Sequence, residues 1–170
     1  IGYKAAYSSA SNNLDSYGST FVGTQAGNNA TSATDLTILG AYAAASNTRG
    51  SKNVAIGAAA LYSNTTQSNN TAAGYQAGYS GTTGAAGAVY VGYQAGYSIT
   101  GTSNTMVGNQ AGYNITTGAK NTILGQYNGN QSGLNIATSS NYIVLSDGDG
   151  QPKFYMDNSG YFTFKNFGST

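Results

Sequence analysis

Few side chains in this sequence could carry acid–base, nucleophilic or metal chemistry. The 170 residues include no His and no Cys, and Glu is absent as well. This composition excludes His-based triads, thiol nucleophiles, the usual zinc sites and the Glu of most glycosidases. Hydrolytic or metal chemistry would have to be built from the five acidic residues that remain, which are Asp15, Asp35, Asp147, Asp149 and Asp157.

Two of these aspartates are close in sequence, in the run from Asp147 to Gly150. A depolymerising enzyme would need two carboxylates a few ångströms apart. A calcium loop would need a longer pattern with a closing Glu, which is missing. Asp-Gly steps are typical of hairpin turns, and the Gly-rich run from Gly81 to Gly84 lacks the Lys of a phosphate loop. We therefore predict turns here, with no catalytic, cofactor-binding or metal-binding residue and no enzymatic activity.

The elements that position the side chains are internal repeats. The segment Asn70 to Tyr79 returns almost intact at Val89 to Tyr97 and again at Asn104 to Tyr113. The first glycine of each copy is here called the anchor glycine. Looser copies on both sides supply further anchors, and successive anchors are 21, 17, 17, 17, 18, 16 and 17 residues apart. Such a period predicts a solenoid with coils of about 17 residues over residues 1–133. The anchors are Gly2, Gly23, Gly40, Gly57, Gly74, Gly92, Gly108 and Gly125.

Other positions of the coil also hold like residues, as stacked coils require. Three residues after the anchor stand Ala5, Ala26, Ala43, Ala60, Ala77, Ala95 and Ala111, with Asn128 as the exception. Five residues after it stand Tyr7, Tyr62, Tyr79, Tyr97 and Tyr113. The alanines indicate a tight interior. The tyrosines could stack on sugar rings, or form a ladder along the solenoid or at an interface between chains.

The coils are expected to be β rather than α. Segments before the anchor are short, rich in β-branched residues and bounded by Gly, Asn and Ser, and no window keeps helical apolar spacing for three turns. Strands about 4.8 Å apart would give a rod roughly 40 Å long for eight coils. The sequence therefore predicts an all-β fold, a repetitive β-roll or β-helix.

Two apolar columns precede the anchor. Directly before it stand Ile1, Val22, Leu39, Ile56, Ala73, Val91, Val107 and Leu124. Two residues before it stand Phe21, Ile38, Ala55, Ala72, Tyr90, Met106 and Ile123. Adjacent strand residues point to opposite faces, so one column should face outward and form an interface, which predicts a homo-oligomer. A corner that turns both columns inward is the alternative.

The repeat fades near Gln131, and residues 134–170 are expected to form a separate C-terminal β-meander. Three strands are predicted, at Asn141 to Ser146, Lys153 to Met156 and Tyr161 to Lys165. Tight turns separate them. A cap of this kind would protect the open edge of the solenoid sheet.

Composition removes further classes of function. Only 6% of residues are charged and the net charge is +1, so the basic surface of a nucleic-acid-binding protein is missing. No apolar run is long enough to span a bilayer, and we expect no membrane insertion. Aromatic and β-branched residues that recur in register favour an ordered solenoid over disorder. The chain starts within a repeat, so we expect that a preceding part belongs to the same protein.

The three near-identical repeats resemble those of bacteriophage tail fibres and are similar to the head repeats of trimeric autotransporter adhesins. The segment Tyr142 to Gly150, followed by Asp157 to Gly160, looks like fibre sequence that precedes an endosialidase-type intramolecular chaperone. The sequence ends at Thr170 without such a chaperone, and we expect either that the chaperone is removed after assembly or that the sequence stops short of it. The coils of adhesin heads are shorter than these, so the resemblance leaves the coil geometry open.

The resemblance implies a homotrimeric β-roll in a virion tail fibre, with a structural and adhesive role in host recognition. Its partners would be a host cell-surface glycan or protein and other fibre or tail proteins, with contacts through the loops Ser8 to Ser19 and Ser80 to Ala88. The alternative is the head of a bacterial trimeric surface adhesin. An ice-binding solenoid is a third reading, prompted by Thr20, Thr37, Thr71, Thr105 and Thr122 three residues before the anchor. Val54 and Val89 interrupt that column.

Overall fold

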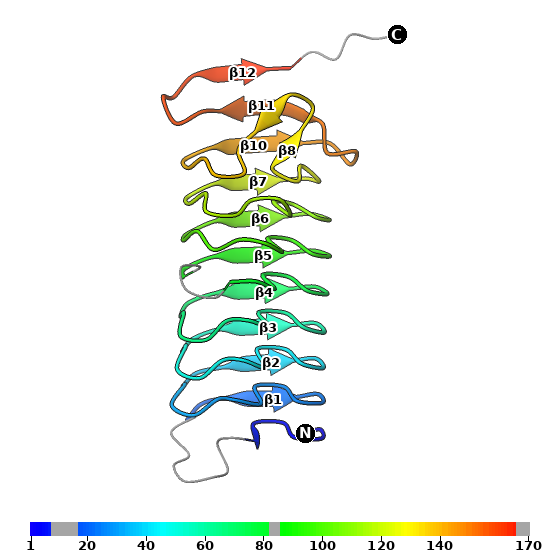
Figure 1. Cartoon of the computed structure of the whole chain (residues 1–170). Helices are drawn as coiled ribbons and strands as arrows, with labels where there is room; N and C mark the ends of the chain where they lie inside the picture. The colour runs from blue at the N-terminus through cyan, green and yellow to red at the C-terminus, as the bar shows by residue number, and fades with distance from the viewer. Residues whose placement is uncertain (8–16, 82–85, 166–170) are drawn as a thin grey trace.

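The computed structural model describes residues 1–7, 17–81 and 86–165. These residues form an all-β solenoid without an α-helix, and the first residues of its coil strands are mostly 17 positions apart. Figure 1 shows the strands stacked as the rungs of a rod, with β1 at one end of the sheet and β12 at the other. The predicted fold class is confirmed.

Ten strands make one sheet, and two short strands form a hairpin beside it (Figure 1). The coil strands pair parallel and in order, each residue with its equivalent in the next coil. These strands are β1 Thr20–Val22, β2 Thr37–Leu39, β3 Val54–Ile56, β4 Thr71–Ala73, β5 Val89–Val91, β6 Thr105–Val107 and β7 Thr122–Leu124. The remaining strands are β8 Asn130–Gln131, β9 Leu134–Asn135, β10 Ile143–Ser146, β11 Pro152–Met156 and β12 Phe162–Phe164.

The anchor glycines end the strands where no side chain fits. At Gly74 the backbone φ is +138°, a conformation that L side chains rarely adopt. A Cβ atom added there would lie 2.3 Å from the carbonyl oxygen of Gly92 in the next coil. The same approach repeats along the stack, with 2.5 Å between a Cβ on Gly23 and the oxygen of Gly40. The glycine column therefore sets the close approach of successive coils.

After the anchor, the chain turns through residues that alternate between left-handed and right-handed conformations. In the coil of Gly92, Gln94 has a φ of 52° and Gly96 a φ of 62°. The alternation points backbone groups up and down the rod: the Gln94 N–H donates to Tyr75 O at 2.9 Å, and the Gly96 N–H donates to Ala111 O at 2.8 Å. The turn thus satisfies its backbone between coils, as a strand would.

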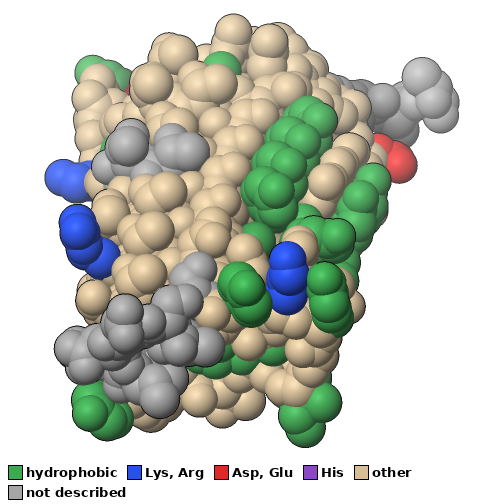
Figure 2. All heavy atoms as spheres, turned by 60° about the horizontal axis from the view of Figure 1, so that its bottom comes forward, with side chains coloured by type: hydrophobic (Ala, Val, Ile, Leu, Met, Phe, Trp, Pro, Cys, Tyr) green, Lys and Arg blue, Asp and Glu red, His purple; other side chains and the backbone are tan. Residues whose placement is uncertain are grey.

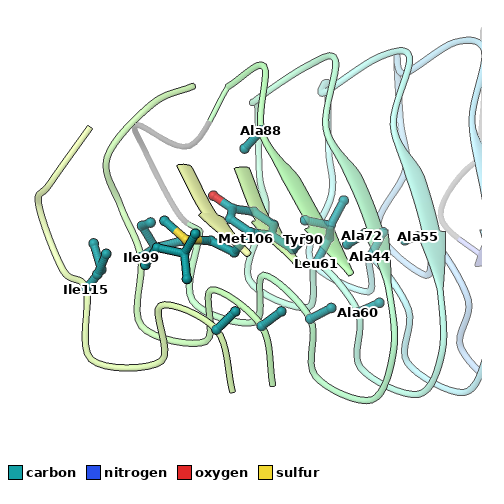
Figure 3. Close-up of a cluster of buried hydrophobic side chains, with 14 of the residues drawn as sticks. Ala44, Ala55, Ala60, Leu61, Ala72, Ala88, Tyr90, Ile99, Met106 and Ile115 are labelled. Carbon is teal, nitrogen blue, oxygen red and sulfur yellow. The ribbon is translucent and has the colours of Figure 1, made fainter. Parts of the chain in front are cut away.

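The interior is thin, and its side chains are matched in size across it. The residue two before the anchor points inward, and it faces the alanine column and the residue four after the anchor. Where the inward residue is Phe21, Tyr90 or Met106, that fourth residue is glycine: a Cβ on Gly96 would lie 2.4 Å from the ring of Tyr90, and one on Gly112 would lie 2.7 Å from the sulfur of Met106. Figure 3 shows Tyr90, Met106 and Leu61 filling the space between the small side chains.

Buried asparagines tie neighbouring coils together directly before β3, β4, β6 and β7. The side-chain oxygen of Asn53 accepts the backbone N–H of Asn70 at 2.9 Å, and that of Asn104 accepts the N–H of Asn121 at 2.9 Å. The side-chain amide of Asn104 donates to Gly118 O at 2.9 Å. Because these amides are buried, their hydrogen bonds avoid a desolvation penalty and hold adjacent coils in register.

The C-terminal strands continue the same sheet. β10 pairs parallel with β7, and the antiparallel strands β11 and β12 follow. The three predicted strands are present, close to their expected bounds. The hairpin β8–β9 was not predicted. It is held to the last coil by the buried hydroxyl of Tyr127, which donates to Leu134 O at 2.7 Å.

Candidate binding surfaces

The aspartates act as caps of turns. One oxygen of Asp147 accepts the backbone N–H groups of Asp149 at 3.1 Å and Gln151 at 2.8 Å, and the other lies 2.9 Å from the ammonium of Lys153. The Lys153 side chain and then the Gln151 N–H lower the pKa of Asp147, because both stabilise its charged form. Asp157 accepts the N–H groups of Ser159 and Tyr161 in the same way.

The carboxylates of Asp147 and Asp157 are thus engaged by backbone N–H groups of their own turns. Asp35 accepts a hydrogen bond from the Thr34 hydroxyl at 3.2 Å, and Asp15 lies outside the described residues. In the part of the chain that the structure describes, no three His, Cys, Asp or Glu side chains gather where they could share a metal ion. The remaining candidate surfaces are the long faces of the rod.

The first surface is the outer face of the ten-stranded sheet, here called the sheet face. It consists of two columns, because the first and third residues of each coil strand point outward and the middle one points inward. One column is Thr20, Thr37, Val54, Thr71, Val89, Thr105, Thr122, Ile143, Met156 and Phe162. The other is Val22, Leu39, Ile56, Ala73, Val91, Val107, Leu124, Leu145, Phe154 and Phe164.

The sheet face is apolar except for five threonines, and it carries no charged residue at its 20 positions, two from each of ten strands. Val91 is 38% exposed and Leu124 is 43% exposed, while Phe162 and Phe164 at the C-terminal end reach 64% and 79%. The alternative in which a corner turns both columns inward is wrong: the column directly before the anchor faces out. The sequence contains a signal for this orientation. The threonines lie two residues before that column, so they point to the same side of the strand, and their hydroxyls are suited to an outer face.

The second surface follows the anchor and begins with a tyrosine ladder. Tyr62, Tyr79, Tyr97 and Tyr113 stack along the rod, with ring centroids 5.1, 5.0 and 5.0 Å apart and interplanar angles of 5°, 6° and 15°. The ladder predicted as one reading of this column is therefore present. Since each ring covers its neighbour, the inner rings offer their edges and hydroxyls to solvent. A sugar ring cannot stack flat on them.

A column of glutamines runs beside the ladder, and a second tyrosine column lies beyond it. Gln94 donates to the side-chain oxygen of Gln76 at 2.8 Å and accepts from Gln110 at 3.2 Å. Tyr75 and Tyr93, directly after their anchors, stack at 5.6 Å. We call these glutamines and both tyrosine columns the Tyr–Gln face. Figure 2 shows stripes of hydrophobic side chains along the rod with polar side chains between them.

The two tyrosine columns are close enough to interact. The pKa of Tyr97 is raised, first by desolvation and then by the neighbouring phenols of Tyr79, Tyr113 and Tyr75. In the first coil, the ammonium of Lys4 lies 5.5 Å from the ring centroid of Tyr3 and 5.1 Å from that of Tyr7. Lys4 is two residues after its anchor, the place that glutamine takes in four of the later coils. A side chain from the turn thus fits between the columns.

The glutamine column was not predicted as part of a site, because the sequence alone suggested no role for these glutamines. Its signal was the Gln two residues after the anchor in each of the three near-identical repeats. Of the loops expected to contact a receptor, residues 8–16 and 82–85 lie outside the described residues. The two surfaces that can be described are therefore built from turns and strands of the solenoid itself.

The structure defines the class of this molecule as an all-β solenoid repeat protein. The chain matches no protein-family model, no curated protein and no solved structure. None of its described segments forms a helix with the length and hydropathy to cross a bilayer.

Proposed function

We propose that this chain is a structural and adhesive segment of a bacteriophage tail fibre, which assembles as a homotrimer and takes part in attachment to the host cell. The observation that carries the proposal is the sheet face, whose 20 outward positions over ten strands hold no charged residue and are apolar except for five threonines. At about 4.8 Å per strand, nine intervals make it about 43 Å long. A surface of this extent on a soluble chain is typical of an interface.

A second copy of the same chain suits this face better than an unrelated partner. Its 20 outward positions match the lower end of the roughly 20–30 residues that a standard interface uses on each side. The face is flat, regular and uncharged, so equivalent strands of two copies can meet at equal heights. Three copies with their sheet faces turned to one axis would cover all three faces and leave the turns outside.

The copies are proposed to run parallel. The N-terminal strands present small or medium side chains such as Thr20 and Val22, whereas β11 and β12 present Phe154, Phe162 and Phe164. Phe154 already contacts both other phenylalanines, at centroid distances of 5.7 and 5.3 Å. In a parallel assembly these aromatic clusters would meet one another and bury their large exposed area. An antiparallel pair would place them against threonines.

Two other readings use the same surface. The head of a bacterial trimeric adhesin would have the same assembly. The two readings differ in where the protein is found, on a virion or on the bacterial cell surface. An ice-binding solenoid is favoured by one observation, the threonine column on the outer face, where Thr37, Thr71, Thr105 and Thr122 occur on successive or alternate strands. That reading requires the face to remain free in solution.

The solution mass of the purified chain tests the proposal. We expect a species of about 52 kDa, three times 17.2 kDa, by light scattering. Val91→Lys combined with Leu124→Lys should lower the mass to that of the monomer, because each lysine would be desolvated inside the interface. Tyr17→Lys is the matched control, since Tyr17 is exposed and lies outside the sheet face.

A monomeric wild-type chain would refute the assembly and leave the threonine column exposed. Thermal hysteresis of that monomer would then decide the ice-binding reading. Far-UV circular dichroism of every variant keeps loss of fold separate from loss of assembly. Immunogold labelling of virions or cells of the source would distinguish the fibre from the adhesin.

A further inference from the structure

We propose that the Tyr–Gln face binds a neutral, extended β-1,4-linked hexose polymer, which lies along the rod with one sugar for each coil. This inference deepens the proposed adhesive function and rests on it, because it names the chemical class of the surface ligand. It involves side chains other than those of the sheet face, so the two proposals can fail separately.

The first argument is the period of the face. The rings of the tyrosine ladder are 5.0–5.1 Å apart over four coils, and three of these coils also hold the hydrogen-bonded glutamines Gln76, Gln94 and Gln110. A β-1,4-linked hexose chain in its extended form advances by close to the same length for each sugar. Successive sugars of such a chain are turned over relative to one another, so equivalent hydroxyls recur at every second sugar and could meet equivalent side chains of every second coil, whereas the helical α-1,4-linked chain would lose this match after one or two sugars.

The second argument is the supply of hydrogen-bonding groups. A glutamine amide has two N–H donors and an oxygen with two lone pairs. Within the column, Gln94 uses one donor toward Gln76 and accepts one bond from Gln110, which leaves one N–H and one lone pair. Each tyrosine adds a hydroxyl that can donate and accept. A polyol ligand needs such mixed donors and acceptors, and the chain of amide bonds fixes the glutamines in advance of binding.

The third argument is the absence of charge. From Tyr62 to Tyr113, the two tyrosine columns and the glutamine column hold no acidic or basic residue. A neutral polymer leaves no unpaired charge on such a surface, while an anionic polysaccharide would lose its hydration without a cation to replace it. The contact of Lys4 with Tyr3 and Tyr7 shows that the space between the columns accepts an inserted group.

The ring geometry determines how the ligand would lie. Because the inner rings cover one another, the sugar cannot stack on a ring face. It would rest against ring edges and hydroxyls, with its own hydroxyls toward the glutamine amides. Four stacked rings give about four sugar positions, so we expect affinity to rise up to about the tetrasaccharide.

Binding is tested with the full chain by titration calorimetry against cellohexaose, with cellobiose and maltohexaose as comparisons. Because the chain has no Trp, intrinsic tyrosine fluorescence gives a second readout. Gln94→Ala and the double variant Tyr79→Ala with Tyr97→Ala remove the two kinds of contact. The coils themselves tolerate these changes, since Ala59 and Ala45 stand at the equivalent positions. Tyr17→Ala is the control, because Tyr17 is 73% exposed and lies outside the face.

We expect cellohexaose to bind roughly tenfold more tightly than cellobiose, and each of the two site variants to lose roughly tenfold while Tyr17→Ala loses nothing. Absence of saturable binding, equal binding of maltohexaose, or unchanged affinity in both site variants would overturn the inference. A fall in the solution mass of the Tyr79 and Tyr97 variant would also overturn it, because the tyrosines would then belong to the interface between copies. The mass of the wild-type chain tests the proposed function independently of these outcomes.

Discussion

The matched sizes inside the solenoid allow a double-mutant test of how its core is packed. Gly96 and Tyr90 face each other across the interior, and a Cβ on Gly96 would lie 2.4 and 2.5 Å from two ring atoms of Tyr90. The backbone of Gly96 has a φ of 62°, but Ala44 and Leu61 adopt similar values at the same place in their coils. A substitution by alanine is therefore limited mainly by the ring, and only secondarily by the backbone.

The expected free energies follow from these contacts. Gly96→Ala alone should destabilise the fold by about 2–4 kcal/mol, from overpacking of about 1–3 and a left-handed alanine of about 1. Tyr90→Ala alone should cost about 3–5 kcal/mol through the cavity that it leaves. In the double variant the new methyl group enters that cavity, so the two losses should combine to about 2 kcal/mol less than their sum.

Urea denaturation followed by circular dichroism measures each free energy of unfolding. All four proteins should be compared at one concentration, because assembly stabilises the folded chain by mass action. Additivity within about 0.5 kcal/mol would refute the reasoning. It would mean that the coils relax around each site separately, and that glycine at this position serves the backbone alone.

Three further predictions concern other parts of the fold. Gly74→Ala should lower the free energy of unfolding, measured by urea denaturation, by about 3 kcal/mol or more, from backbone strain and the clash with the next coil. Gly148→Ala is the control and should change it by less than about 0.5 kcal/mol, because nothing lies within 4 Å of its added Cβ. Equal losses in the two variants would contradict the role of the anchor. Tyr90→Phe should stabilise the chain by about 1 kcal/mol, because the Tyr90 hydroxyl is buried without a hydrogen-bond partner among the described residues; a loss of stability would reveal a missed partner. Burial raises the pKa of Tyr90 and of Tyr127 well above the ordinary value. The part of the free energy of unfolding that depends on keeping these two phenols protonated is therefore complete below about pH 10, and it is lost as the pH rises through their higher pKa values in the folded state. Ultraviolet titration should show two tyrosines that ionise only with the loss of circular dichroism, and full ionisation of a folded chain would contradict this.

The fold could be predicted from sequence because one period governs many positions at once. Anchor glycines such as Gly74, the alanine column and the tyrosine column each repeat in register, and only stacked coils place all of them consistently. The hairpin β8–β9 could not be predicted, since Asn130–Gln131 and Leu134–Asn135 are too short to show a pattern and depend on the tertiary contact of Tyr127. The glutamine column was present in the sequence, but its hydrogen bonds arise only when coils stack.

The direction of the two apolar columns was the part of the candidate site that sequence reasoning left open, and it carries the strongest argument for assembly. The inward column varies from Ala55 to Tyr90 because the opposite wall varies with it. The outward column before the anchor stays apolar on every strand, from Val22 to Phe164, although no wall of the same coil covers it. Threonine stands at five positions of the neighbouring outward column, so an outward position of a strand does not by itself require an apolar side chain. The apolar outer column is explained once another copy of the chain covers it.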